Sequence, residues 1–289
     1  AHLLAPVEIG HYDVFGMPQK LDISGHYLHT VCGLTGLKTV DVSSPETPVL
    51  AGSYAMESAL YPSGLSLNDV AISGACDYVA DEGGGLLIVN ATDLYSLSLI
   101  TRVSEQSDPT KPWCWPDGGR SVTVGGGFAY VVGFRAFPAC IGVVDVSEPA
   151  SATGATCIES GLYIYDIELQ GTHLYLAEDD FVAGEYNHQL TILDVSDPTA
   201  SVKVGHVETP NYPSGIFVSD SYAYVTDSGM HIIDIADPEL PAIVGFCETP
   251  GSATDVTVAG SYAYVADGES GVRVIDVSTP ATPTEICSC

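Results

Sequence analysis

Three aspartates occupy the same position in separate copies of a repeated sequence pattern, and together they carry the chemistry of a cation site. Asp69, Asp166 and Asp255 each stand at the start of a short apolar segment. Carboxylate oxygens are the ligands that Ca²⁺ prefers, so one interpretation is a Ca²⁺ cofactor site made by these three residues. The other interpretation is that the aspartates cap turns of the repeat through their own backbone. The sequence leaves both open.

Aromatic residues gather in the segments whose length varies from one repeat to the next. Trp113 and Trp115 flank Cys114 in one such segment. Exposed tryptophan and tyrosine offer rigid amphipathic area, which suits a glycan platform or a protein interface. The candidate binding residues are Tyr61, Trp113, Trp115, Phe137, Phe181, Tyr186 and Tyr212. Alternatively, the tryptophans form a small core of their own insertion, with Cys114 bridged to Cys140.

The chain has 8 cysteines and no C-x-x-C pair, which favours disulfides and an oxidising compartment. Their connectivity cannot be deduced from spacing, and the candidates are Cys114, Cys140, Cys157, Cys247, Cys287 and Cys289. The first residue is Ala1, which suits a mature chain whose signal peptide has been removed. We therefore expect a secreted, extracellular or cell-surface protein.

No catalytic motif stands out. The sequence has no Gly-x-Ser-x-Gly elbow, phosphate-binding loop or dinucleotide fingerprint. None of the 8 histidines forms a His-x-x-x-His pair, and we interpret them as structural. A hydrolase that uses acidic residues brought together from distant repeats stays open as one alternative. Asn90-Ala91-Thr92 is a formal glycosylation sequon, and whether it carries a glycan is undecided.

The charge balance excludes two classes of partner. Lys and Arg number 8 against 37 Asp and Glu, which gives a formal net charge of −29. Such a surface repels phosphate backbones and anionic lipids, so we expect no nucleic-acid partner. Uncharged stretches are too short for a membrane span, and we expect no membrane insertion. With 30 Gly and 18 Pro, an all-helical fold is also excluded.

Six segments share one pattern that must position all of these residues. Each ends in an element such as Asp-Val-Ser-x-Pro, whose first residues are Asp41, Asn90, Asp145, Asp194, Asp234 and Asp276. They recur at intervals of 40 to 55 residues, close to the length of a four-stranded propeller blade. Alternating Val and Ile between Gly, Asp, Ser and Pro is typical of short strands and tight turns.

The sequence therefore predicts an all-β fold in which residues 1–289 form a single six-bladed β-propeller of four-stranded blades. The expected blades lie at about 14–54, 66–103, 119–159, 164–207, 215–248 and 254–289. The turns between first and second strands are uniformly tight, whereas the connections at the opposite rim vary in length. We expect binding on that elaborated rim, because loops on a rigid scaffold commonly carry function.

The repeats resemble the LVIVD repeat family of β-propellers over about residues 14–289. The segments YVADG and GVRVIDVSTP carry the resemblance, which six copies make specific. The second blade departs from the pattern at Asn90 and Leu94. The resemblance implies an extracytoplasmic or cell-surface propeller without an assigned enzymatic role, and it supplies no catalytic residues.

Residues 1–13 contain an additional segment, Val7–Tyr12, that looks like a seventh outer strand. Either it closes the chain's own propeller beside the last blade, or it is donated to a neighbouring molecule. Three functions follow as hypotheses. The first is a structural protein that self-associates into a surface assembly or filament, with itself as partner. The second is a cell-surface module that binds a protein or glycan. The third is the hydrolase.

Overall fold

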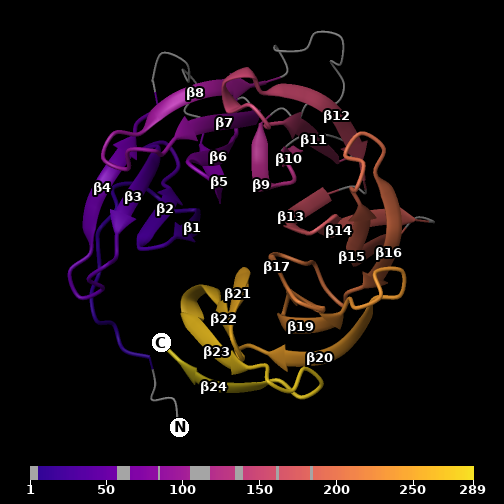
Figure 1. Ribbon diagram of the computed structural model, residues 1–289. Helices are drawn as coiled ribbons and strands as arrows, with labels where there is room; N and C mark the ends of the chain where they lie inside the picture. The colour runs from indigo at the N-terminus through magenta and orange to yellow at the C-terminus, as the bar shows by residue number, and fades with distance from the viewer. Residues whose placement is uncertain are drawn as a thin grey trace. The chain divides into compact units, whose positions relative to one another are not determined.

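Six four-stranded antiparallel sheets make the protein a six-bladed β-propeller, as the sequence predicts (Figure 1). The computed structural model describes residues 6–56, 66–83, 85–104, 118–133, 139–160, 163–182 and 185–289. Residues 8–160 belong to a first compact unit, and residues 161–289, together with the chain up to Val7, belong to a second. Each unit contains three blades.

The first unit contains blades 1 to 3. Blade 1 consists of β1 (Lys20–Ser24), β2 (Tyr27–Val31), β3 (Leu37–Asp41) and β4 (Val49–Tyr54). Blade 2 consists of β5 (Leu67–Ser73), β6 (Cys76–Asp81), β7 (Gly85–Asn90) and β8 (Ser98–Val103). Blade 3 consists of β9 (Gly119–Gly125), β10 (Phe128–Gly133), β11 (Cys140–Asp145) and β12 (Thr153–Glu159), with the 3-10 turn η2 (Pro149–Ser151) before its last strand.

The second unit contains blades 4 to 6. Blade 4 consists of β13 (Tyr163–Gln170), β14 (His173–Val182), β15 (Glu185–Asp194) and β16 (Val202–Glu208). Blade 5 consists of β17 (Ile216–Ser219), β18 (Tyr222–Thr226), β19 (Gly229–Asp234) and β20 (Ala242–Glu248). Blade 6 consists of β21 (Asp255–Ala259), β22 (Tyr262–Ala266), β23 (Val272–Asp276) and β24 (Thr284–Ser288), with the 3-10 turn η3 (Gly268–Ser270) before β23.

The repeated turn element has the same geometry in all six blades. Its first residue ends the third strand, and its side-chain oxygen accepts a hydrogen bond of 2.8–3.0 Å from the backbone N–H two residues later. Where that later residue is serine, its hydroxyl and N–H hold the pKa of Asp41, Asp145, Asp194 and Asp276 below the usual value. A register shift then follows in every outer strand. The element therefore reverses the chain and bends the fourth strand.

Within each unit, neighbouring blades pack through apolar faces of their strands. Between blades 2 and 3, Tyr78, Leu86 and Ile88 meet Val122, Ala129 and Val131. The same positions are used between blades 5 and 6, where Tyr224, Met230 and Ile232 meet Val256, Ala263 and Val265. Each of these side chains is buried, and burial of such a residue contributes about 1.5–3 kcal/mol.

A glycine of the outer strand brings neighbouring blades into close contact at their periphery. A Cβ atom on Gly52, Gly205 or Gly245 would collide with the carbonyl oxygen of the next blade's turn. These oxygens belong to Leu94, Pro238 and Pro280, respectively. Only glycine permits this approach without a shift of backbone, which explains its repetition at this position.

The segment Val7–Tyr12 forms no strand within the chain, so it does not close the last blade, and its donation to a neighbouring molecule stays a prediction. The segment lies outside any strand, although the structure describes it in full. The physical reason is that β24, from residues 284–288, already pairs with β23 as the fourth strand of blade 6. Blade 6 is therefore complete without a contribution from residues 7–12.

The apolar interface between blades 1 and 2 contains a group of polar residues. His29 stands where blade 2 has Tyr78, and its cross-strand neighbour Thr39 stands where blade 2 has Ile88. Asp77 of blade 2 faces them, and its Oδ2 lies 2.8 Å from His29 Nδ1. All three residues are buried, and Asp77 Oδ1 and Thr39 Oγ1 have no hydrogen-bond partner within the described part of the chain. Buried polar atoms without partners lower the free energy of unfolding. This interface therefore contributes less stability than the apolar interfaces between blades 2 and 3 and between blades 5 and 6.

We predict that this polar group can be exchanged for the apolar pattern of the other blades. Asp77→Ala alone should lower the free energy of unfolding by about 3 kcal/mol, because it leaves His29 buried without its partner. The triple variant His29→Tyr, Thr39→Ile, Asp77→Ala should recover that loss or exceed the wild type by about 1–4 kcal/mol. Urea unfolding measures both, and a triple variant no more stable than Asp77→Ala would contradict the prediction.

Candidate functional site

Three of the predicted aromatic residues belong to blade 4 and the connection that follows it. Phe181 and Tyr186 lie directly opposite each other in the β14–β15 hairpin, whereas Tyr212 follows β16 and is 57% exposed. The sequence predicts one of the connections of variable length at residues 178–189, but most of these residues extend the β14–β15 hairpin. Tyr61, Trp113, Cys114, Trp115 and Phe137 lie outside the described residues.

The predicted calcium ligands Asp69 and Asp166 bind backbone of the next blade within their own unit. Asp69 Oδ2 accepts hydrogen bonds of 2.9 Å from Val122 N and from Ser121 Oγ. Asp166 Oδ2 accepts one of 3.3 Å from Ile216 N. Asp22 of blade 1 does the same with Ile72 N, at 2.8 Å.

Each of these aspartates also caps its own strand. The other carboxylate oxygen, Oδ1, accepts a hydrogen bond of 2.7–3.0 Å from the backbone N–H of the following residue. Asp255 makes the same local bond to Val256 N, at 2.9 Å. Among the described residues, no group of three or more His, Cys, Asp or Glu side chains is arranged to hold a metal ion. The Ca²⁺ site at Asp69, Asp166 and Asp255 stays a prediction.

Three further carboxylates, Asp81, Asp227 and Asp267, end second strands or follow them directly, and each is paired with an arginine or a histidine. Asp81 Oδ2 lies 3.2 Å from Arg102 Nη2, and Asp227 Oδ2 lies 3.0 Å from His231 Nε2. Asp267 Oδ2 lies 3.1 Å from Arg273 Nε, and Arg273 also pairs with Glu285 at 3.2 Å.

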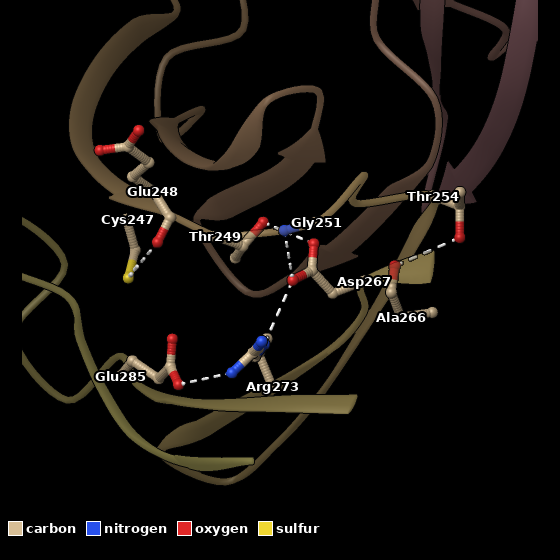
Figure 2. Close-up of polar contacts among 9 residues, drawn as sticks. All are labelled: Cys247, Glu248, Thr249, Gly251, Thr254, Ala266, Asp267, Arg273 and Glu285. Atoms are coloured by element: carbon tan, nitrogen blue, oxygen red, sulfur yellow. Dashed lines mark hydrogen bonds and ion pairs between the residues drawn. The ribbon is translucent and has the colours of Figure 1, made fainter. Parts of the chain in front are cut away.

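Figure 2 shows that Asp267 also holds the connection between blades 5 and 6. Its carboxylate accepts hydrogen bonds from Thr249 Oγ1 at 2.7 Å and from Gly251 N at 2.9 Å. With Arg273, these donors satisfy a carboxylate that is fully buried. The arrangement makes Asp267 a structural anchor of this rim.

An Asp–His–Tyr cluster at the base of the extended hairpin is the candidate functional site. Asp179 Oδ1 lies 2.6 Å from His188 Nδ1, and its Oδ2 accepts a hydrogen bond of 2.8 Å from Tyr165 Oη. Beside it, Glu178 Oε1 accepts a hydrogen bond of 3.1 Å from Gln189 Nε2. Asp179 is buried, while His188 remains partly accessible. Sequence reasoning missed this cluster because its members come from three strands and carry no motif.

The exposed Tyr212 lies against this cluster. Its ring centroid is 4.0 Å from that of His188, and the rings are tilted by 47°. The neighbouring Asn211 donates a hydrogen bond of 3.1 Å to Ser228 Oγ, which in turn contacts Asp227. The connection between blades 4 and 5 thus joins the Asp179–His188 pair to the Asp227–His231 pair.

The geometry fixes the histidine for hydrogen bonding. An ionised carboxylate only accepts hydrogen bonds, so His188 Nδ1 donates to Asp179, and Nε2 is the acceptor of the neutral ring. Nε2 has no hydrogen-bond partner among the described residues. An oriented imidazole beside an exposed tyrosine can bind a polar ligand through one hydrogen bond and one aromatic face.

The predicted disulfides are not confirmed, because no two described cysteines lie at bonding distance. The nearest approach is 3.4 Å, between the sulfur atoms of Cys140 and Cys157. Cys247 Sγ contacts the carbonyl oxygen of Glu248 at 3.9 Å (Figure 2), and burial raises the pKa of its thiol. Cys287 and Cys289 lie at the end of blade 6.

A family model confirms the resemblance noted in the sequence. The LVIVD repeat matches residues 15–56, 66–105, 118–155, 163–209, 212–249 and 250–289. The chain therefore belongs to the LVIVD repeat family. No curated protein matches it.

Solved structures share the fold at low sequence identity. A functionally unknown protein from Desulfotomaculum acetoxidans DSM 771 is 13% identical, with a TM-score of 0.70 over 92% of this chain and 84% of that one. A hypothetical selenium-binding protein from Sulfolobus tokodaii is 12% identical, with a TM-score of 0.66 over 93% and 79%. The computationally designed Ika8 protein is 9% identical, with a TM-score of 0.63 over 94% and 73%. These likenesses show the fold alone.

Across the described residues, no helix has the length and apolar character needed to cross a membrane.

We predict an acid-sensitive contribution of Asp227 to stability. Burial raises the pKa of this carboxyl, but the hydrogen bond and charge of His231 outweigh burial and hold the pKa below the usual value. The folded state therefore takes up this proton less readily than the unfolded state. The stability gained is present above the unfolded pKa and is lost as the pH falls through the folded pKa.

Asp227→Asn should consequently flatten the fall in melting temperature between about pH 5 and about pH 2. Thermal scans at several pH values measure the effect. Glu239→Gln is the matched control, because it removes the same charge from an exposed turn of the same blade. An Asp227→Asn profile parallel to that of the wild type would contradict the assignment.

Proposed function

We propose that the protein is a non-enzymatic structural propeller whose copies associate through the segment Val7–Tyr12 into an extracellular surface assembly. The observation that carries this proposal is the contact of Gly10 with Pro45. A Cβ atom on Gly10 would collide with the carbonyl oxygen of Pro45 in the turn of blade 1. Gly52, Gly205 and Gly245 of the outer strands meet the next blade's turn in the same way.

The local sequence supports this equivalence. Gly10 stands three residues after Val7, as Gly52 stands after Val49 and Gly205 after Val202. The segment therefore takes the place of an outer strand that precedes blade 1. It differs from the true outer strands in one respect, because it forms no strand pairing.

An outer-strand segment without strand pairing suits addition to a sheet edge of another molecule. Val7 is 77% exposed and Ile9 is 59% exposed, so alternate side chains of the segment offer apolar surface. The outermost strand of each blade presents an unpaired backbone edge. If the segment of one copy pairs with the outer strand β24 of the next, the contact is heterologous and generates an open polymer.

The charge of the chain sets the conditions for such an assembly. Copies that each carry a formal charge of −29 repel one another at low ionic strength. Salt screens this repulsion over about 10 Å at 0.1 M. We therefore expect association to strengthen as the salt concentration rises.

Deletion of residues 1–12 should abolish association and leave a folded single chain, because no blade draws a strand from this segment. Gly10→Val should weaken association as well. Its side chain would collide with the turn of blade 1 in the same chain and displace the segment from the position in which we propose that it pairs. Native mass measurement and electron microscopy at low and high salt provide the readout, with thermal melting as the check of folding. Glu8→Ala is the control, because it changes an exposed side chain of the same segment.

Two results would overturn the proposal. One is a wild-type protein that stays a monomer of 30.2 kDa at every salt concentration. The other is a deletion variant that still forms the polymers of the wild type.

A second candidate function is binding of a protein or glycan at the blade 4 rim. The observation that favours it is the exposed Tyr212 ring over His188, whose orientation Asp179 fixes. A sugar face stacked on tyrosine with a hydroxyl donating to His188 Nε2 fits this chemistry. The hydrolase hypothesis has less support, because Asp69, Asp166 and Asp267 are engaged in structural contacts.

We predict that Tyr212→Ala lowers binding to a glycan array by about tenfold or more, because it removes the stacking surface. Tyr95→Ala is the matched control, since Tyr95 is also exposed but lies at a turn of blade 2. Equal binding by the wild type and by Tyr212→Ala would count against a glycan site at this rim.

A further inference from the structure

Two cysteines of blade 3 are placed as a local redox pair. Cys140 begins β11, and Cys157 lies on the neighbouring outer strand β12. Gly142 is the direct cross-strand partner of Cys157, so the two cysteines are diagonal neighbours on one face of the sheet. Their sulfur atoms are 3.4 Å apart.

The two thiols differ in access to solvent. Cys140 is 4% exposed, because β11 is an interior strand of the sheet. Cys157 is half-buried and lies on the outermost strand of its blade. A reagent in solution can therefore reach Cys157 before it reaches Cys140.

We propose that Cys140 and Cys157 form a reversible cross-strand disulfide by exchange with a small disulfide such as oxidised glutathione. This inference goes beyond the proposed function and does not depend on it. The two sulfur atoms must approach from the present 3.4 Å to a bond length of about 2.05 Å. Closure of the bond would tie the outer strand β12 to the interior of blade 3.

The reaction balances in two exchange steps. The Cys157 thiolate attacks one sulfur of the small disulfide, forming a mixed disulfide and releasing one small thiol. The Cys140 thiolate then attacks Cys157 Sγ, forming the protein disulfide and releasing the second small thiol. Two protein thiols are oxidised, the small disulfide is reduced, and the two protons remain with the released thiols.

The positions of lysine and arginine allow tryptic peptides to show which cysteines are bonded. Trypsin cleaves after Arg102, Arg120, Arg135 and Lys203, so Cys140 and Cys157 share the peptide 136–203 and Cys114 lies on the peptide 103–120. The alternative pair, Cys114 with Cys140, would join these two peptides. Cleavage before Asp145, which lies between Cys140 and Cys157, separates the partners of the proposed bond into two linked fragments.

The experiment equilibrates the full chain in glutathione buffers of graded redox potential, blocks remaining thiols by alkylation and maps the peptides by mass spectrometry. We expect peptide 136–203 to lose two hydrogen atoms and to carry no alkyl group under oxidising conditions. Cys114→Ser should retain this bond, whereas Cys157→Ser should lose it. Linkage of peptides 103–120 and 136–203, or alkylation of Cys140 and Cys157 at every potential, would overturn the proposal.

Thermal melting gives a second readout that does not depend on peptide recovery. The proposed bond closes a loop between residues 17 apart in sequence. A reductant should therefore lower the melting temperature of the wild type by about 5 °C, and of Cys114→Ser equally. It should leave Cys157→Ser unchanged. An equal response of wild type and Cys157→Ser would also contradict the proposal.

Discussion

Aspartates that bind the backbone of the next blade are the interaction on which the packing of each unit depends. Asp22, Asp69 and Asp166 each stand on the first strand of a blade. Each places one oxygen on its own strand and the other on a backbone N–H of the following blade. Charge-assisted hydrogen bonds of this kind are about twice as strong as neutral ones. The first strands of neighbouring blades are thereby held in fixed register, and the apolar faces behind them meet in one arrangement.

The fold could be predicted because the contacts that define the repeated turn lie between residues close together in sequence. In every blade the turn residue, such as Asp145, bonds the N–H two positions later, and this requires only residues adjacent in sequence. For Asp69 and Asp166, the sequence left two interpretations open, namely cation binding and turn capping. Their bonds to Val122 and Ile216 span about fifty residues, so only the position of the neighbouring blade reveals them.

The candidate site was harder to predict for the same reason. Tyr212 was expected as a binding residue from its type and its place in a variable connection. Its neighbour His188 was expected to be structural, because nothing in the sequence places His188 and Tyr165 on the two oxygens of the Asp179 carboxylate. The hairpin that carries them is longer than expected, since residues 178–189 lack the alternation typical of the other strands.

The buried His29–Asp77 pair has a consequence for a chain built from similar units. Six blades with interchangeable apolar faces could be shuffled during folding, or exchanged between crowded molecules, with little energetic penalty. Blade 1 is different, because its His29 imidazole pairs with the carboxylate of Asp77 on blade 2. The position of blade 3 that matches Asp77 is the apolar Ala129. Incorrect pairing would strand a polar group in the interior. The pair thus makes the contact between blades 1 and 2 different from the apolar contacts, and it favours one order of the blades over others.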